Sequence, residues 1–305
     1  MSHRKVICIV GPTGVGKSEI AIHLAKKYDG IIINADSRQL YKGVPIITAQ
    51  PTFEERSLIP HKLYACLELY EKISAGRWVT LAAEQLDSIC YTKIPLLVGG
   101  TGLYLRALFD GIVAIPPISI ELSLTMEKQA EEKGISFLYD ILKLHDPLYA
   151  NSIHPNDRQR VLRALMVFYE TGKTFTWWHQ QVTEAYPATV LRIGIKIPLI
   201  ELTPLLEKRI DKMFAQGAIE EVITIYKRYF NKDVQNWSGI GYMELLGAIK
   251  GEYTFNEAKE RWLKNTRSYA KRQLTWFNAD KRIIWFYPDQ LEDIQKYIEN
   301  WLHQE

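Results

Sequence analysis

The sequence predicts an α/β fold, in which a parallel sheet is flanked by helices and interrupted by an inserted all-helical domain. Short apolar runs typical of buried strands alternate with stretches of helical periodicity in the first hundred residues. The strand-like runs are residues 6–10, 30–34 and 94–98, and the helical stretches include residues 19–28 and 80–91. Alternating strands and helices form parallel sheets whose carboxyl ends line the ligand site.

A long helical region then replaces this alternation. From residue 121 to about 181 the chain has helical periodicity, with expected breaks at Gly134, Asp146-Pro147, Pro155 and Gly172. Strand-like composition returns at residues 189–197. We therefore expect a core domain of residues 1–115 and 189–305, and an inserted helical domain of residues 116–188.

The remainder of the chain is predicted to be mainly helical. Helices are expected at residues 202–229, 242–249, 256–276 and 289–301. The short apolar run at residues 283–286 is a candidate last edge strand.

Composition limits the class of protein. The 305 residues are 47% hydrophobic and carry a net charge of only +3, so any nucleic-acid site must be local. The three cysteines, Cys8, Cys66 and Cys90, form no C-x-x-C pair, which favours a reducing, cytoplasmic location over a disulfide or zinc framework. Because residues 1–5 lead directly into a strand and no apolar run approaches about 20 residues, we expect neither a signal peptide nor a membrane span.

The first strand is followed by a phosphate-binding loop. Residues 11–18 read Gly11, Pro12, Thr13, Gly14, Val15, Gly16, Lys17 and Ser18, which fits G-x-x-x-x-G-K-[ST] between a strand and a helix. Glycines let backbone N–H groups turn toward phosphate oxygens, and the helix N-terminus adds positive charge. Lys17 can reach the outer phosphates and Ser18 can hold Mg²⁺. The fold is thus expected to be P-loop NTPase-like, although the loop alone does not identify its phosphate ligand.

Two further strand ends carry candidate groups. Asp36 follows the second strand, where it can accept a proton, bind Mg²⁺ through water, or simply cap a turn. Gly99-Gly100-Thr101-Gly102 follows the third strand, and is either a ligand-binding loop or a tight structural turn. This third strand has no terminal acid of the Walker B type, which argues against an NTP-hydrolysing motor, although Asp36 could supply the carboxylate instead.

Two basic segments are candidates for nucleic-acid contact. Arg160 and Arg163 share one face of a helix that begins near Pro155, and this face could equally be solvated surface. Residues 261–282 hold seven Lys or Arg against one acid, interleaved with Trp262, Tyr269, Trp276 and Phe277. Cations and stacking aromatics favour RNA binding, but aromatics at helical spacing can also be core residues.

Taken together, these motifs resemble the tRNA dimethylallyltransferase family, also called tRNA delta-2-isopentenylpyrophosphate (IPP) transferases. The similar segments follow the family order and cover nearly the whole chain. They are residues 11–18, 36–43, 95–104 (PLLVGGTGLY), 154–165 (HPNDRQRVLRAL), 239–242 (GIGY) and 269–277 (YAKRQLTWF).

The resemblance implies a substrate pair and a reaction. The loop would hold dimethylallyl diphosphate rather than ATP, and N6 of the adenine at tRNA position 37 would attack its allylic carbon. The product would be N6-dimethylallyladenosine, with diphosphate leaving. Asp36 would accept the N6 proton, while Lys17, Arg209 and Mg²⁺ on Ser18 would stabilise the diphosphate. Thr101 would lie near the reacting groups, and the target adenine would be flipped out of its stack.

The resemblance also implies tRNA contacts, with the helical domain embracing the anticodon stem-loop. The segments concerned are residues 36–39, 159–163, 238–243 and 271–278. The individual residues are Asp36, Ser37, Arg38, Gln39, Thr101, Ser123, Gln159, Arg160, Val161, Leu162, Arg163, Gly241, Tyr242, Lys271, Arg272, Gln273 and Trp276.

Three positions depart from the family pattern. Ser123 and Asn278 stand where arginines are usual, and Gln50 replaces a common lysine before Pro51. Residues 60–64 (PHKLY) keep only part of a P-H-H-L-[IV]-D pattern. These losses of positive charge could alter the tRNA footprint but touch none of the expected catalytic residues.

Three other functions remain open at this stage. They are prenylation of free adenine nucleotides, phosphoryl transfer from ATP by a small-molecule kinase, and nucleotide-dependent RNA binding without turnover. The helical insertion and the basic C-terminal half favour tRNA over a free nucleotide. Nothing in the sequence points to an obligate dimer, so we expect a monomer.

Overall fold

The computed structural model describes residues 4–181, 183–229 and 238–304, and forms two compact units. The core unit comprises Met1–Phe109 and Tyr186–Glu305, and the helical unit comprises Asp110–Ala185. These boundaries lie a few residues from the expected ones. Tyr186 belongs to the core unit because its N–H donates to Leu108 O at 2.8 Å and its hydroxyl contacts Asp87 Oδ1 at 2.7 Å.

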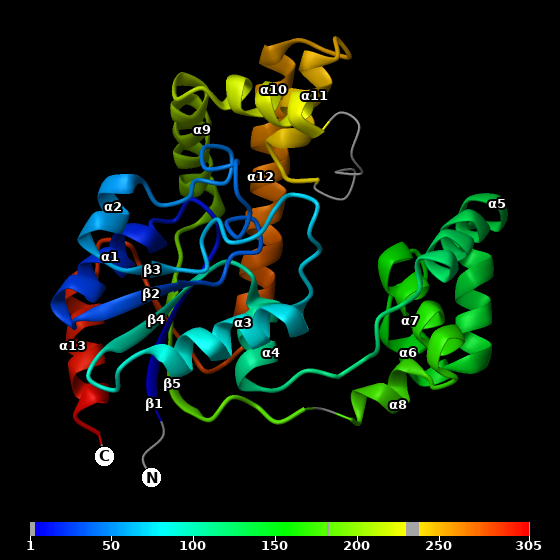
Figure 1. Ribbon diagram of the computed structural model, residues 1–305, viewed down its shortest axis with the longest axis horizontal. Coiled ribbons are helices and arrows are strands. Elements are labelled where there is room, and N and C mark those ends of the chain that lie inside the picture. Colours follow the sequence, from blue (N-terminus) through cyan, green and yellow to red (C-terminus); the bar gives the residue numbers. More distant parts are fainter. Residues whose placement is uncertain (1–3, 182, 230–237, 305) are drawn as a thin grey trace. The chain divides into compact units, whose positions relative to one another are not determined.

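The core unit is built on a six-stranded sheet with strand order β3-β2-β4-β1-β5-β6, and every pairing is parallel (Figure 1). The strands are β1 (Arg4–Val10), β2 (Gly30–Asn34), β3 (His61–Lys62), β4 (Ile94–Gly99), β5 (Ala188–Ile195) and β6 (Ile283–Phe286). The predicted α/β class is therefore confirmed, as is the edge position of β6. The sequence analysis missed β3, since a polar two-residue strand leaves no apolar run to recognise.

Alternation along β1 explains the layers on the two sides of the sheet. Val6 and Cys8 pack in one apolar cluster, while Ile7 and Ile9 pack in another. The first cluster is covered by α3 (Ala75–Ser88) and α4 (Gly102–Phe109), and the second by α1 (Lys17–Lys27) and α13 (Leu291–Leu302). Successive residues point to opposite faces, so β1 is buried on both sides, as expected of a central parallel strand.

The remaining core helices largely follow the predicted pattern. They are α2 (Phe53–Leu58), α9 (Leu199–Ala215), α10 (Ala218–Tyr229), α11 (Tyr242–Ile249) and α12 (Phe255–Asn278). The stretch predicted to be helical over 202–229 consists of two helices, because Gly217 between them adopts φ 96°. The long helix α12 begins with a capping box in which Thr254 and Glu257 exchange hydrogen bonds with each other's backbone N–H.

The helical unit contains α5 (Ile120–His145), α6 (Pro147–Ser152), α7 (Arg158–Thr171) and α8 (Phe175–His179). Gly134, with φ 80°, kinks α5 where a break was expected. The buried Asp146 carboxylate accepts N–H groups from Tyr149 at 3.2 Å and Thr176 at 2.8 Å, and so ties α6 to α8. Within the described residues, no helix of either unit is long and apolar enough to cross a bilayer.

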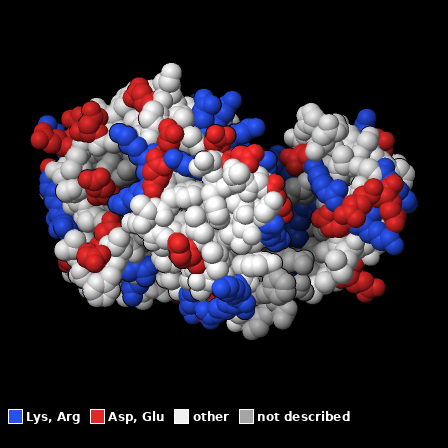
Figure 2. All heavy atoms as spheres, turned by 90° about the horizontal axis from the view of Figure 1, so that it is seen from above, with Lys and Arg blue, Asp and Glu red and all other residues white. Residues whose placement is uncertain are grey.

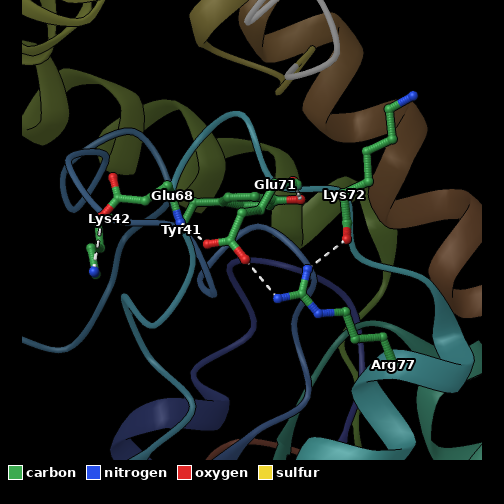
Figure 3. Close-up of polar contacts among 6 residues, drawn as sticks. All are labelled: Tyr41, Lys42, Glu68, Glu71, Lys72 and Arg77. Atoms are coloured by element: carbon green, nitrogen blue, oxygen red, sulfur yellow. Dashed lines mark hydrogen bonds and ion pairs between the residues drawn. The ribbon is translucent and has the colours of Figure 1, made fainter.

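A polar network fixes the loop that follows β2 (Figure 3). Tyr41 forms an isolated parallel bridge with Leu67, and its hydroxyl donates to Glu71 O at 3.2 Å. Arg77 donates to Glu71 Oε1 at 2.6 Å and to Lys72 O at 2.9 Å. The segment after β3 is therefore fastened to residues 39–42, which continue directly from the predicted Asp36 site.

Candidate active site

The phosphate loop has the geometry that its glycines predict. Gly11, Gly14 and Gly16 all adopt positive φ, at 143°, 81° and 92°. A Cβ at Gly11 would overlap the backbone carbonyl of Ile195 on β5, so a side chain cannot fit there. The loop therefore ends β1 in a tight turn and delivers Lys17 to the first position of α1.

Two cations lie against this loop. Lys17 Nζ donates to Pro12 O at 2.6 Å, and Arg209 Nη1 donates to Thr13 Oγ1 at 3.0 Å. Burial lowers the pKa of Lys17 to about 8, against the opposing effect of the Asp36 carboxylate. Burial likewise lowers the pKa of Arg209, again opposed by Asp36. Arg209, which its position in α9 alone would class as a surface residue, belongs to the loop environment.

The turn after β2 places Asp36 opposite these cations. Its N–H donates to Asn34 Oδ1 at 2.8 Å, and its Oδ1 accepts the N–H of Arg38 at 2.9 Å. Within the described residues, Asp36 Oδ2 accepts no hydrogen bond. The backbone of Asp36 is thus fixed while one carboxylate oxygen stays available to a ligand.

Thr101 joins the second glycine turn to this site. Its Oγ1 accepts the N–H of Ser37 at 3.0 Å, and its own N–H donates to Ala35 O at 3.1 Å. A Cβ at Gly99 would overlap the backbone of Ala35, so the two strand ends must approach closely. The structure therefore brings Asp36 and Thr101 together as the sequence analysis expected.

Lys17, Asp36 and Arg209 line a cleft of about 1140 Å³ in the core unit, and Thr101 adjoins it through its hydrogen bond to Ser37. The lining mixes charged and polar side chains with apolar ones. The polar lining includes Lys17, Ser18, Asp36, Arg38, Gln39 and Arg209, and the apolar lining includes Ile46, Ile47, Phe53, Leu206, Met213 and Ile240. A cleft lined by both cations and apolar side chains suits a ligand that joins phosphates to a hydrocarbon group.

The residues present fit a Mg²⁺ ion bound together with phosphates. The Ser18 hydroxyl is exposed to the cleft that Asp36 also lines, and both offer the hard oxygen ligands that Mg²⁺ prefers. In the described part of the chain, no group of three or more His, Cys, Asp or Glu side chains could hold a metal by itself. Phosphate oxygens and water would have to complete the coordination.

Gln273 lies elsewhere than expected. It was assigned to tRNA contact, but it is 5% exposed and bonds to Thr13 N and Gly100 O, each at 2.9 Å. Both ends of its amide bond to groups inside the core unit, so this buried side chain does not make the expected surface contact. The one sign of this position in the sequence is that Gln273 lies four residues after Tyr269, on the same face of the helix.

The aromatic residues of α12 divide into two groups. Trp262 and Phe277 are each 3% exposed and belong to the core, which is the second of the two roles that their helical spacing left open. Trp276 is 41% exposed, and Tyr269 lines the cleft. Burial and the nearby Asp36 raise the pKa of Tyr269.

The expected contacts near Gly241 are also partly buried. Gly241 adopts φ 94°, and a Cβ there would overlap the Trp262 ring. Tyr242, the first residue of α11, is only 8% exposed and packs in the core. Arg38 Nη2 donates to Ser238 O at 3.2 Å, which places residues 238–240 at the cleft rim. The sequence analysis missed the buried Glu244, which accepts Gly241 N–H at 2.6 Å.

In the helical unit the expected tRNA residues divide in the same way. Gln159, Arg160 and Arg163 are exposed on α7. Val161 and Leu162, at 0% and 3% exposure, are core residues of this unit, so their side chains cannot be the surface contacts expected of them. On the face drawn in Figure 2, basic and acidic side chains are interspersed, in keeping with the small net charge.

The positions that depart from the family pattern have local roles. Gln50 is buried, donates to Tyr41 O at 2.7 Å and accepts from Arg56 Nη2 at 3.4 Å. Ser123 Oγ donates to Ser119 O at 2.9 Å within the first turn of α5. Asn278 is exposed at the last residue of α12.

The chain is similar in sequence to known proteins over nearly its whole length. The family model described as IPP transferase matches residues 39–280. The chain is 93% identical over 302 residues to the tRNA dimethylallyltransferase of Lawsonia intracellularis, covering 99% of this chain and 100% of that one. It is 46% identical over 299 residues to the enzyme of the same name from Maridesulfovibrio salexigens, covering 98% of each chain.

Two solved structures are similar over most of the chain. The tRNA isopentenylpyrophosphate transferase of Bacillus halodurans is 32% identical, with a TM-score of 0.70 and coverage of 97% of this chain and 96% of that chain. A eukaryotic dimethylallyltransferase acting on tRNA is 31% identical, with a TM-score of 0.79 and coverage of 93% and 74%. By sequence and by fold, this chain belongs to the IPP transferase family.

Proposed function

We propose that this protein transfers a dimethylallyl group from dimethylallyl diphosphate to N6 of adenine 37 in tRNA. One observation carries the proposal: Lys17, Arg209 and Asp36 line a single cleft that apolar side chains line as well. The full-length similarity to tRNA dimethylallyltransferases supports the same substrate pair.

Each residue has a distinct part in the transfer. The N6 nitrogen bonds to the allylic carbon as the carbon–oxygen bond to diphosphate breaks, and the N6 proton passes to Asp36 Oδ2. An exocyclic adenine amine is a weak nucleophile, so a carboxylate that both orients it and accepts its proton lowers the barrier. Lys17, Arg209 and the loop amides stabilise the charge that develops on the leaving diphosphate. A Mg²⁺ ion, held through Ser18 and phosphate oxygens, would add further stabilisation of that charge.

The end of β4 supports a prenyl diphosphate rather than ATP as the ligand. This strand ends in Val98-Gly99-Gly100, with no carboxylate in the place where a Walker B acid would lie. The turn is instead packed so closely on Ala35 that glycine is required at position 99. Phosphoryl transfer by a kinase would have to take this second metal ligand from another element, such as Asp36 after β2.

The tRNA is bound, in this proposal, by exposed cations of both units. Arg160 and Arg163 on α7 contact the anticodon stem-loop backbone, and Lys271 and Arg272 on α12 contact phosphates near the cleft. The target adenine must leave its stack to reach Asp36. Because tRNA is the acceptor, we place the protein in the cytoplasm, and we propose that it acts as a monomer.

The decisive assay combines purified protein, Mg²⁺, dimethylallyl diphosphate and an unmodified tRNA with adenine at position 37. Nucleoside mass spectrometry should detect N6-dimethylallyladenosine. A tRNA with guanine at position 37 is the matched control and should remain unmodified. Alkylation of AMP or ADP with unmodified tRNA would instead identify an adenine-nucleotide prenyltransferase, and phosphate transfer from ATP would identify a kinase.

A further inference from the structure

Helix α12 reaches both catalytic loops through one side chain. Gln273 Oε1 accepts the N–H of Thr13 in the phosphate loop at 2.9 Å, while its Nε2 donates to the carbonyl of Gly100 at 2.9 Å. The residue is 5% exposed, so both bonds lie out of competition with solvent. One amide therefore spans the gap between the end of β1 and the end of β4.

The glycines of the second turn admit this helix. A Cβ at Gly100 would overlap the Gln273 amide, and a Cβ at Gly102 would overlap the Trp276 ring. Glycine at these two positions thus allows α12 to lie directly on the turn. The contact is specific to the helix face that carries Gln273, because Lys271 and Arg272 beside it are exposed.

Tyr269, one helical turn before Gln273, braces the same turn from a second point. Its side chain lies beside Thr101, whose Oγ1 accepts the N–H of Ser37 at 3.0 Å. Residues four apart lie on one face of a helix. A single face of α12 thus contacts the phosphate loop, the glycine turn and, through Thr101, the turn that holds Asp36.

The bond to Gln273 also determines what Thr13 can do. Its N–H is committed to Gln273 and its hydroxyl accepts a bond from Arg209 at 3.0 Å. Thr13 therefore anchors the loop, and the N–H groups that grip phosphate must come from later in it.

We propose that Gln273 is a positioning residue for the transfer reaction. It sets the spacing between the phosphate loop, which holds the diphosphate, and the turn that carries Thr101 beside Asp36. This inference rests on the proposed function for its kinetic consequence. Displacements of about 1 Å between reacting groups can cost roughly 100-fold in rate.

The test is Gln273→Met, which keeps the length and volume of the side chain but leaves Thr13 N–H and Gly100 O unpaired. We expect kcat to fall roughly 100-fold and the affinity for inorganic pyrophosphate with Mg²⁺ to weaken, while the affinity for tRNA stays at the wild-type value. Gln295→Met is the matched control, since Gln295 bonds Lys27 on the far side of α1 and lines no part of the cleft. Its kinetic constants should match wild type.

Two further arms keep the test decisive. If Gln273→Met does not fold, Gln273→Asn retains an amide that is one methylene too short to reach both partners, and should show the same losses. Reduced tRNA affinity with unchanged kcat and pyrophosphate binding would overturn the proposal and make Gln273 a tRNA contact. If wild-type protein transferred no prenyl group, the proposed function would fail, and the pyrophosphate titration would still test Gln273 separately.

Discussion

The cleft of the core unit and the α7 face of the helical unit were both assigned functional residues from sequence, but they differ in how the structure treats them. In the core unit, Asp36 and Lys17 line the cleft and Thr101 bonds to the turn that carries Asp36, and each of the three is held by at least one hydrogen bond of 2.6–3.1 Å. On α7, Arg160 is exposed, whereas its neighbours Val161 and Leu162 are buried.

The difference follows from the local structure of each region. Parallel strand ends converge whatever the side chains beyond them, so a motif at each end defines a site. A surface helix alternates buried and exposed positions, so a contiguous motif on it always mixes core residues with contacts. Position in a family motif is therefore a better guide to role at a strand end than along a helix.

The largest effect is expected from Asp36→Asn. The amide cannot accept the N6 proton, although its oxygen can still accept the Arg38 N–H that fixes the turn. We expect the rate constant of single-turnover prenylation to fall about 10²- to 10⁴-fold, with an unchanged melting temperature. A rate near that of the wild-type protein would show that Asp36 does not accept the proton. It would also weaken the conclusion that motif position predicts role better at a strand end than along a helix.

The next largest effect is expected on the stability of the helical unit. Leu162→Ala removes a side chain that is only 3% exposed, so it should reduce the free energy of unfolding, measured in denaturant melts, by about 2–5 kcal/mol. Arg160→Ala, two residues earlier, should change the free energy of unfolding by less than about 0.5 kcal/mol. It should also reduce the slope of log affinity for tRNA against log salt concentration by about 1, because one phosphate contact is lost. A reversal of these two results would contradict the division of α7 into core and surface.

Sequence reasoning was strongest where backbone constraints are local. The loop from Gly11 to Ser18, strands β2 and β6 and helix α11 were located correctly because glycine positions and apolar runs determine them. The partners of Gln273 lie 260 and 173 residues away, and no local pattern reports contacts at such separation. For the same reason, only the family resemblance assigned Arg209 to the site.

Arg209→Met should weaken diphosphate stabilisation. A hydrogen bond from a charged group contributes about 1.5–3 kcal/mol, so kcat/KM for dimethylallyl diphosphate should fall roughly 10- to 150-fold. Lys208→Met changes the preceding exposed lysine of α9 and is the matched control, with constants expected at wild-type values. Equal losses in the two variants would indicate a general field effect rather than the contact with Thr13.

The smallest effect is expected from pH. Lys17 is charged below its pKa of about 8 and neutral above it, so KM for dimethylallyl diphosphate should rise as pH increases through 8, by at most about tenfold per unit. In Lys17→Arg the inflection should disappear, because a guanidinium stays protonated throughout this range. A KM that stays flat in the wild-type protein up to pH 9.5, roughly one and a half units above that pKa, would show that Lys17 does not bind the diphosphate as a cation.

The most direct test of the central claim, that this cleft prenylates adenine 37 of tRNA, is nucleoside mass spectrometry of tRNA from cells lacking the gene. The account predicts loss of N6-dimethylallyladenosine and every nucleoside derived from it. It also predicts their return when the wild-type gene is restored, but not when the Asp36→Asn gene is supplied. Persistence of these nucleosides in the cells that lack the gene would contradict the account.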